Sequence, residues 1–251
     1  MSLLGLALYT LVTLLVLASL LLARITLIVL GTHNPPIATS PKPKVIAKVQ
    51  NATIAIFLGS GGHTAEMMRL LDGLNTTRYD ARIYIISSGD NLSEAKALQL
   101  ESRINSGSFD ILQIPRARRV LQSYLTSPFT TIYSLIFCLW HISLRPMLLS
   151  RGRNERRVFA DVILLNGPGS CVPIAFAAFL PRVLGLPSSK LIYVESLART
   201  RRLSVSAKLV RPIMDRFFVQ WESLRESLQP SGEKPGKKRW MATVECEGWL
   251  V

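Results

Sequence analysis

The chain has 251 residues, which suits one or two domains, and it carries a formal net charge of +14 with a pI of about 10.3. This excess of Lys and Arg favours contact with anionic lipid headgroups or a phosphorylated substrate, whereas nucleic-acid binding is not expected because no nucleic-acid-binding module is recognisable. Cys138, Cys171 and Cys246 lie far apart, which excludes a disulfide framework and a cysteine metal site and fits a reducing compartment.

An uncharged apolar run, residues 3–23, opens the chain. As a helix it is about 30 Å long, the thickness of a bilayer core. The alternative is a cleaved signal peptide, which would need a basic residue before the run and a clear small-residue cleavage site after it. The first basic residues, Arg24, Lys42, Lys44 and Lys48, all follow the run, so we expect a single-pass anchor with the C-terminal body in the cytosol.

The composition divides the chain into four segments. We expect the anchor over residues 1–30, a Pro-rich linker that lifts the body off the membrane over residues 31–48, one α/β domain over residues 49–229, and a C-terminal segment over residues 230–251. The last segment starts with a charged, low-complexity stretch, PSGEKPGKKR, and ends in a partly apolar tail.

Within the α/β domain, apolar runs of strand type alternate with helical stretches. The predicted strands are residues 52–58, 81–87, 109–114, 162–165, 191–194 and 215–220, of which 215–220 is expected to be the last full strand. The predicted helices are residues 64–74, a helix that starts near Asn91 with a capping box to Glu94, and residues 172–184. Continuous apolar strands joined by helices predict a parallel sheet covered on both faces, that is, a single Rossmann-like domain that binds its ligand at the carboxyl ends of the strands.

Residues 129–144 interrupt this alternation with a nearly all-apolar helix between Pro128 and Pro146. Three interpretations stay open: a second membrane span, for which the run is short, a core helix, or a helix lying in the headgroup region. A core helix or a headgroup helix suits the run better than a span, because basic residues follow closely: Arg145, Arg151, Arg153, Arg156 and Arg157.

The stretch IAIFLGSGGHTAE, residues 54–66, is the most informative of the chain. A strand ends in glycines and a helix follows at once, so the backbone can approach a ligand closely and the helix N-terminus offers N–H groups to an anion. The dinucleotide fingerprint requires a glycine where Thr64 stands, and the Gly-Lys pair of a phosphate loop is absent. An anion cradle is therefore predicted, made of Gly59, Ser60, Gly61, Gly62 and Thr64, with His63 at its corner; an ordinary strand-to-helix turn is the alternative.

A second glycine-rich loop, NGPGS, follows the strand 162–165 at the same edge of the sheet and contributes Asn166, Gly167, Gly169 and Ser170. Two such loops facing one crevice suit two phosphates. Three arginines, Arg116, Arg118 and Arg119, follow the third strand, and they are suited either to bidentate phosphate contacts or to a solvated basic face.

Glu195 ends the strand 191–194, where its carboxylate would point into the ligand crevice and accept hydrogen bonds from sugar hydroxyls. The structural alternative is that it caps the next helix or pairs with Arg199, Arg201 or Arg202.

Five motifs occur together: GSGGHTAEM (59–67), IPRARRVLQSY (114–124), LNGPGSCVP (165–173), IYVESLAR (192–199) and DRFFVQW (215–221). In this order they resemble the membrane-anchoring subunit of the UDP-N-acetylglucosamine transferase that makes dolichyl-diphosphate chitobiose in asparagine-linked glycosylation. More distantly, GSGGHT, NGPGS and YVES are similar to the acceptor-binding half of the bacterial transferase MurG. Residues 230–239 depart from the pattern of the family, whose C-terminal end contacts the catalytic partner.

The resemblance implies the acceptor-side Rossmann domain of a split GT-B glycosyltransferase at the endoplasmic reticulum membrane or the continuous outer nuclear membrane. A soluble subunit would hold UDP-GlcNAc, and the chain would be inactive alone. The two loops and the arginines would bind the diphosphate of dolichyl-diphosphate-GlcNAc, whose 4-hydroxyl attacks with inversion. His63 is the first choice for the base and Glu195 the second, or a sugar ligand; no cofactor or metal is implied. The alternatives are a scaffold that only recruits the partner, and a nucleotide-dependent oxidoreductase, which the missing third glycine opposes.

Overall fold

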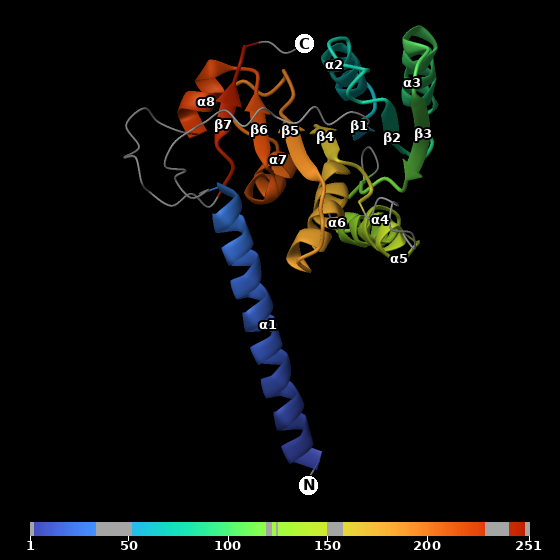
Figure 1. Ribbon diagram of the computed structural model, residues 1–251. Helices are drawn as coiled ribbons and strands as arrows, with labels where there is room; N and C mark the ends of the chain where they lie inside the picture. Colours follow the sequence, from blue (N-terminus) through green and yellow to red (C-terminus); the bar gives the residue numbers. More distant parts are fainter. Residues whose placement is uncertain are drawn as a thin grey trace, which may run out of the picture.

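The structure is a computed structural model that describes residues 3–33, 52–118, 122–123, 125–149, 158–228 and 241–248. Its centre is a seven-stranded sheet of order β3-β2-β1-β4-β5-β6-β7, in which every pair of neighbours is parallel (Figure 1). The first six strands have the 3-2-1-4-5-6 order of the doubly wound dinucleotide-binding fold. The prediction of one Rossmann-like domain with a parallel sheet is therefore confirmed.

The strands agree with the predicted ones to within one or two residues, with one omission. They are β1 Thr53–Leu58, β2 Ala81–Ser87, β3 Ser108–Ile114, β4 Val162–Asn166, β5 Lys190–Val194, β6 Arg216–Val219 and β7 Val244–Cys246. The strand near residues 215–220 is expected to be the last full one, and beyond it only the three-residue β7 follows, which pairs with β6 and forms the edge of the sheet. Three residues after a charged stretch are too few to show a period of two.

The helices that cover the sheet are α2 Gly62–Leu71, α3 Asn91–Ile104, α4 Ser127–Cys138, the π-helical turn η1 Leu139–Leu144, α5 Arg145–Leu149, α6 Cys171–Val183, α7 Val205–Val210 and α8 Glu222–Leu228; a 3-10 turn, η2 Arg211–Ile213, follows α7. The expected capping box at Asn91 is wrong by one residue. The N-cap of α3 is Asp90, whose carboxylate accepts from the N–H of Ser93 at 3.2 Å and from its hydroxyl at 2.7 Å.

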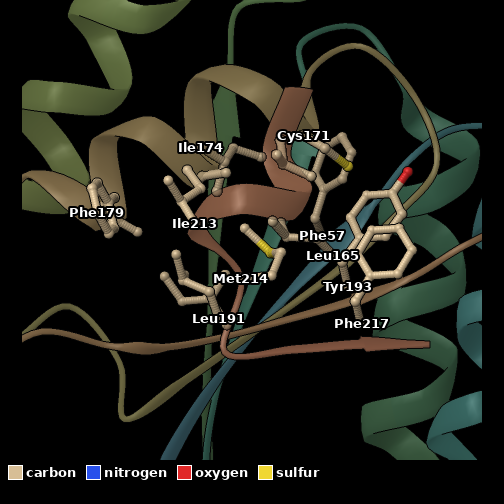
Figure 2. Packing of buried hydrophobic residues seen from close by; sticks show 14 of the residues in the cluster. Phe57, Leu165, Cys171, Ile174, Phe179, Leu191, Tyr193, Ile213, Met214 and Phe217 are labelled. Carbon is tan, nitrogen blue, oxygen red and sulfur yellow. The ribbon is translucent and has the colours of Figure 1, made fainter. Parts of the chain in front are cut away.

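Successive residues of β1 point into two separate cores. Ile54, Ile56 and Leu58 belong to the apolar cluster under α2 and α3, whereas Ala55 and Phe57 belong to the cluster under α4, α6 and α7. Figure 2 shows this second cluster, in which side chains of α6 gather over the strands. Because both faces are covered, all six residues of β1 are buried.

A buried ion pair lies on the α2–α3 side. Arg82 is 1% exposed and donates from Nε and Nη2 to the two carboxylate oxygens of Glu101, at 2.6 and 2.7 Å. The hydroxyl of Tyr84 donates to the same carboxylate at 2.6 Å, and burial together with this bond raises the pKa of Tyr84. The network ties β2 to α3.

The N-terminal helix α1 (Leu3–His33) extends away from the body (Figure 1). Its stretch Leu6–Gly31 is long and apolar enough to cross a membrane and is only 6% buried; it extends beyond the uncharged run 3–23 and coincides with the anchor expected over residues 1–30 to within one residue at its end. The end of α1 packs on the body: Ile25, Ile28 and Val29 join the core cluster that contains α6, and Arg24 donates to the carbonyl of Val183.

The helix α1 overlaps the start of the expected Pro-rich linker. It stays helical to His33, within the linker expected over residues 31–48, and its end contacts α6. The remainder of the linker, with Lys42, Lys44 and Lys48, lies outside the described residues, as do Arg119, Arg151, Arg153, Arg156, Arg157 and residues 229–240.

Candidate functional site

A cleft of about 1030 Å³ opens at the carboxyl edge of the sheet. Its walls come from the loops that follow β1, β3, β4 and β5, from the start of α7, and from Ser127 and Thr131 of α4. The sequence predicted a site at this edge, since the carboxyl ends of parallel strands all meet there.

The two glycine-rich loops contact each other, and Gly59 makes this approach feasible. A Cβ at Gly59 would lie 2.4 Å from Cδ of Pro168 and 3.2 Å from the carbonyl oxygen of Asn166. Gly59 therefore packs one loop on the other instead of lining the cleft. Gly61, with φ of +60°, is the N-cap of α2, and its neighbours Ser60 and Gly62 line the cleft.

His63 enters the cleft from the first turn of α2 and packs on the second loop. A Cβ at Gly167 would lie 2.1 Å from Nδ1 of His63, and Gly167 has φ of +84°, a left-handed value that favours glycine. Glycine at this position thus leaves space for the imidazole. A third of the His63 side chain is exposed, so the ring is accessible to a ligand in the cleft.

A chain of hydrogen bonds fixes the orientation of this imidazole. Nδ1 of His63 lies 3.0 Å from Oδ1 of Asn166, whose Nδ2 donates to Oε2 of Glu66 at 3.1 Å. The hydroxyl of Ser196 donates to the other oxygen of Glu66 at 2.8 Å. The direct distance from His63 to Glu66, 3.9 Å, is too long for a hydrogen bond.

The donor and acceptor roles in this series of hydrogen bonds follow from the carboxylate of Glu66. A carboxylate only accepts, so Glu66 makes the amide of Asn166 present its NH₂ group to Glu66 and its oxygen to His63. Nδ1 of the neutral imidazole must then carry the proton, and Nε2 is left as the acceptor nitrogen. In its neutral form, His63 can therefore take a proton at Nε2.

Glu195 lies in the cleft wall but is 1% exposed, and its carboxylate is already engaged. One oxygen accepts from the N–H of Ser196 at 3.2 Å, and the other accepts from the N–H and hydroxyl of Ser204 at 2.9 and 3.1 Å. Ser204 is in turn the N-cap of α7. The helix-capping alternative is thus close to what is observed, and none of the ion pairs among the described residues joins Glu195 to an arginine.

Arginines surround the cleft on two sides. Arg116 donates from Nε to the carbonyl of Ser88 at 3.2 Å, and Arg118 donates to the carbonyl of Gln122 at 2.9 and 3.3 Å; both line the cleft. Arg199 lines it from the loop after β5. From the sequence, Arg199 is expected only as an alternative partner of Glu195, and its place in the cleft wall is not predicted.

The predicted anion-binding residues fall into two groups. Those that line the cleft are Ser60, Gly62, Gly167, Gly169, Ser170, Arg116 and Arg118. Thr64 and Asn166 are buried: Thr64 Oγ1 lies 2.7 Å from the hydroxyl of Ser93, on the side of α3, and Asn166 serves the imidazole. Sequence reasoning missed Glu66 and Ser196, although Glu66 lies one helical turn after His63, a spacing that brings side chains together.

The two glycine-rich loops are also joined to the arginine loop. The hydroxyl of Ser170 accepts from the N–H of Ala117 at 3.2 Å, which links the loop after β3 to the loop after β4. Across the described ranges, no group of three or more His, Cys, Asp or Glu side chains is arranged to hold a metal ion.

Solved structures with a similar fold are distant in sequence. A UDP-N-acetylglucosamine 2-epimerase has a TM-score of 0.45 at 14% identity, with 78% of this chain and 45% of that chain covered. LpCGTa in complex with UDP has a TM-score of 0.43 at 14% identity, with 80% and 53% covered. The chain spans about half the length of these proteins.

Relatives in sequence are much closer. The family model described as "Oligosaccharide biosynthesis protein Alg14 like" matches residues 54–234, which include both glycine-rich loops. The UDP-N-acetylglucosamine transferase subunit ALG14 of Candida albicans is 46% identical over 198 residues, 79% of this chain and 82% of the relative. The subunit of the same name from Mus musculus is 38% identical over 197 residues, 75% and 84% of the two chains. The chain therefore belongs to the Alg14 family, and the predicted resemblance to a UDP-N-acetylglucosamine transferase subunit is confirmed.

Proposed function

We propose that the chain is the membrane-anchored, acceptor-binding subunit of a heteromeric transferase that adds the second GlcNAc to dolichyl-diphosphate-GlcNAc on the cytosolic face of the endoplasmic reticulum. The observation that carries this proposal is one cleft at the sheet edge that combines a base-competent His63 with Arg116, Arg118 and Arg199. A helix long enough to cross a membrane is part of the same chain, which suits a lipid substrate.

The acceptor diphosphate would lie between the two glycine-rich loops. Ser60 and Gly62 stand at the N-terminus of α2, and Gly169 and Ser170 stand at that of α6. Both helix ends offer N–H groups and partial positive charge to an anion. Arg116 and Arg118, with Arg119 beyond them in the sequence, would add charge-assisted contacts from the side.

His63 would act as the general base. The 4-hydroxyl of the acceptor GlcNAc attacks the anomeric carbon of UDP-GlcNAc, the new C–O bond forms as the bond to UDP breaks, and the configuration inverts. The hydroxyl proton passes to Nε2 of His63, and UDP leaves with the bonding electron pair. Since both oxygens of Glu195 already accept from protein donors, we assign to Glu195 the shaping of the loop 196–204 and keep His63 as the base.

The donor sugar needs a second polypeptide in this proposal. A GT-B enzyme holds its nucleotide sugar between two Rossmann domains, and the described part of this chain forms one sheet. A soluble subunit that binds UDP-GlcNAc would complete the cleft, and this chain alone would be inactive.

The test is a reconstitution with the full chain. The chain in lipid nanodiscs is assayed for transfer of labelled GlcNAc from UDP-GlcNAc to a polyprenyl-diphosphate-GlcNAc acceptor, first alone and then with candidate soluble partners. We expect transfer only with a partner, and His63→Ala should lower kcat about 10²- to 10⁴-fold while co-purification with the partner is unchanged.

Two results would contradict the proposal. Transfer by the isolated chain would refute the split arrangement. Full activity of His63→Ala in the assembled pair would refute the catalytic cleft and leave a scaffold that only recruits its partner. His141→Ala is the matched control, because that ring stacks on Phe137 at 3.9 Å and does not line the cleft.

A further inference from the structure

The helical segment Ser127–Leu149, made of α4, η1 and α5, turns several hydroxyl groups toward the protein, beside Cys138 and Ile142, which belong to the core. The hydroxyls of Thr130 and Thr131 donate to the carbonyl of Ala117 at 2.7 and 3.1 Å, and that of Ser134 donates to the carbonyl of Pro115 at 2.8 Å. A surface helix of a water-soluble domain carries its polar residues on the outward side instead.

The outward side of the segment is apolar and aromatic. Five large side chains are each 50% or more exposed, and they are Phe129, Ile132, Tyr133, Ile136 and Trp140. Their spacing of three or four residues places them on one helix face about 16 Å long. The inward side of the segment packs on the core through Cys138 and Ile142, as the core-helix interpretation expects, whereas the contiguous exposed face on its other side marks an interaction surface.

The topology of the sheet excludes a membrane crossing by this segment. β3 precedes it and β4 follows it, and both strands belong to the same sheet through their pairings with β2 and β1. One crossing would put the two halves of the sheet on opposite sides of the bilayer. Only residues 150–161 separate Leu149 from β4, too few for the roughly 20 residues of a returning helix.

The position of α1 indicates what covers the face. The candidate membrane helix contacts α6 through Ile25, Ile28 and Val29, and α6 also packs against α4 and η1. In Figure 1, α4, α5 and α6 lie on the side of the sheet toward which α1 extends, and α2 and α3 lie on the other side. The exposed face thus belongs to the side of the body nearest the bilayer.

We propose that this face of α4 and η1 lies in the boundary between headgroups and acyl chains of the leaflet that α1 enters. Phe, Tyr and Trp side chains are suited to this region, and a helix lying there buries its apolar side about 5–10 Å deep. The exposed Arg145 at the start of α5 follows the apolar face and can reach anionic headgroups.

The functional role that we assign to this lipid contact rests on the proposed function. Ser127 and Thr131 on the protein side of α4 line the cleft, while the opposite side of the same helix contacts lipid. The cleft then lies about one helix diameter, roughly 10 Å, from the leaflet. A lipid diphosphate reaches the two glycine-rich loops without its hydrocarbon chain leaving the membrane.

The first test measures lipid contact and needs no transferase activity. The full chain is reconstituted in liposomes whose acyl chains carry bromine at defined carbons, which quenches tryptophan fluorescence on contact. In a Trp140→Phe background, Tyr133→Trp is compared with Leu92→Trp, an exposed position on α3 on the opposite face of the sheet. The other tryptophans contribute equally to both variants.

We expect the added Tyr133→Trp emission to be quenched by bromine near the headgroup end of the chains, and less by bromine near the bilayer centre. The added Leu92→Trp emission should not be quenched. Equal quenching of the two variants would overturn the proposal, and so would protection of Tyr133→Trp only after a protein partner is added, since a protein would then cover the face.

The second test uses the reconstituted transferase. Ile136→Lys should raise the KM for a long-chain polyprenyl acceptor in liposomes about tenfold and leave the KM for a short-chain acceptor in detergent unchanged. Leu98→Lys, at an exposed position on α3, is the control. An equal effect on both acceptors would mean local structural damage and would contradict the lipid contact. Failure of the proposed function would instead abolish transfer in every variant and leave the quenching result unaffected.

Discussion

Replacing Gly167 by Ala tests how the loop after β4 positions His63. Gly167 has φ of +84°, where an L residue is strained by about 1–2 kcal/mol. Its Cβ would also lie 2.1 Å from Nδ1 of His63, whereas ordinary contact begins at 3.4 Å. The imidazole must therefore move by about 1.3 Å or rotate away.

A movement of this size breaks the 3.0 Å hydrogen bond between His63 and Asn166. The proton of the neutral imidazole is then no longer held on Nδ1. Displacing a catalytic group by about 1 Å lowers a rate by about 10²-fold, which equals about 2.7 kcal/mol of lost transition-state stabilisation. We expect Gly167→Ala to lower kcat of the reconstituted transferase about a hundredfold, with an unfolding temperature reduced by only a few degrees.

Gly89→Ala is the matched control. Gly89 has φ of +76°, but no atom lies within 4 Å of its added Cβ, so this variant has similar backbone strain and no clash. It should lose similar thermal stability and keep a kcat near that of the wild type. If Gly167→Ala keeps a kcat close to that of Gly89→Ala, the contact with the imidazole does not control the reaction and the reasoning is refuted.

Three further substitutions separate catalysis from stability. Glu66→Ala should lower kcat about tenfold or more, because the amide that orients the imidazole can then flip; Glu66→Gln, which retains an accepting oxygen, should restore most of the rate at unchanged KM for UDP-GlcNAc. Glu195→Gln should reduce the unfolding free energy by about 1–3 kcal/mol in thermal denaturation, since one of its amide hydrogens must face an N–H group; an unchanged unfolding temperature with abolished transfer would identify Glu195 as the base instead. Glu101→Leu should destabilise by about 3–5 kcal/mol because Arg82 stays buried without its carboxylate, and a comparable loss in Glu245→Leu, which breaks a surface pair, would contradict this estimate.

The fold was predictable because its central strands are covered on both faces, and β1 is buried throughout. A run such as IAIFL in β1 is continuously apolar, and this pattern indicates a parallel sheet between two helical layers. The three-residue β7 gives no such signal, because its pairing with β6 depends on where residues far along the chain return to the sheet edge. The docked end of α1 was equally hidden, since Ile25, Ile28 and Val29 are as apolar as the membrane helix that they continue.

The loops that form the site were predictable, but it was not predictable which of their residues face the cleft and which contact other parts of the protein. The position of a glycine is evident in the sequence, yet whether it contacts ligand or protein depends on a distant neighbour: Pro168 for Gly59 and His63 for Gly167. Glu195 was correctly located at the end of a strand, but its acceptor roles depend on Ser204, nine residues later in a folded loop. Glu66 becomes important only because Asn166 and Ser196 converge on it from two other loops.

The seating of α1 on α6 has a practical consequence for preparing a soluble form of this protein. A chain shortened to begin after His33 would expose the α6 surface that Ile25, Ile28 and Val29 cover. It would also lack Arg24, which donates a hydrogen bond to the carbonyl of Val183. A chain that begins at Arg24 would discard the most apolar turns and keep this patch covered. The chain that begins at Arg24 should therefore aggregate less without detergent than the chain that begins after His33.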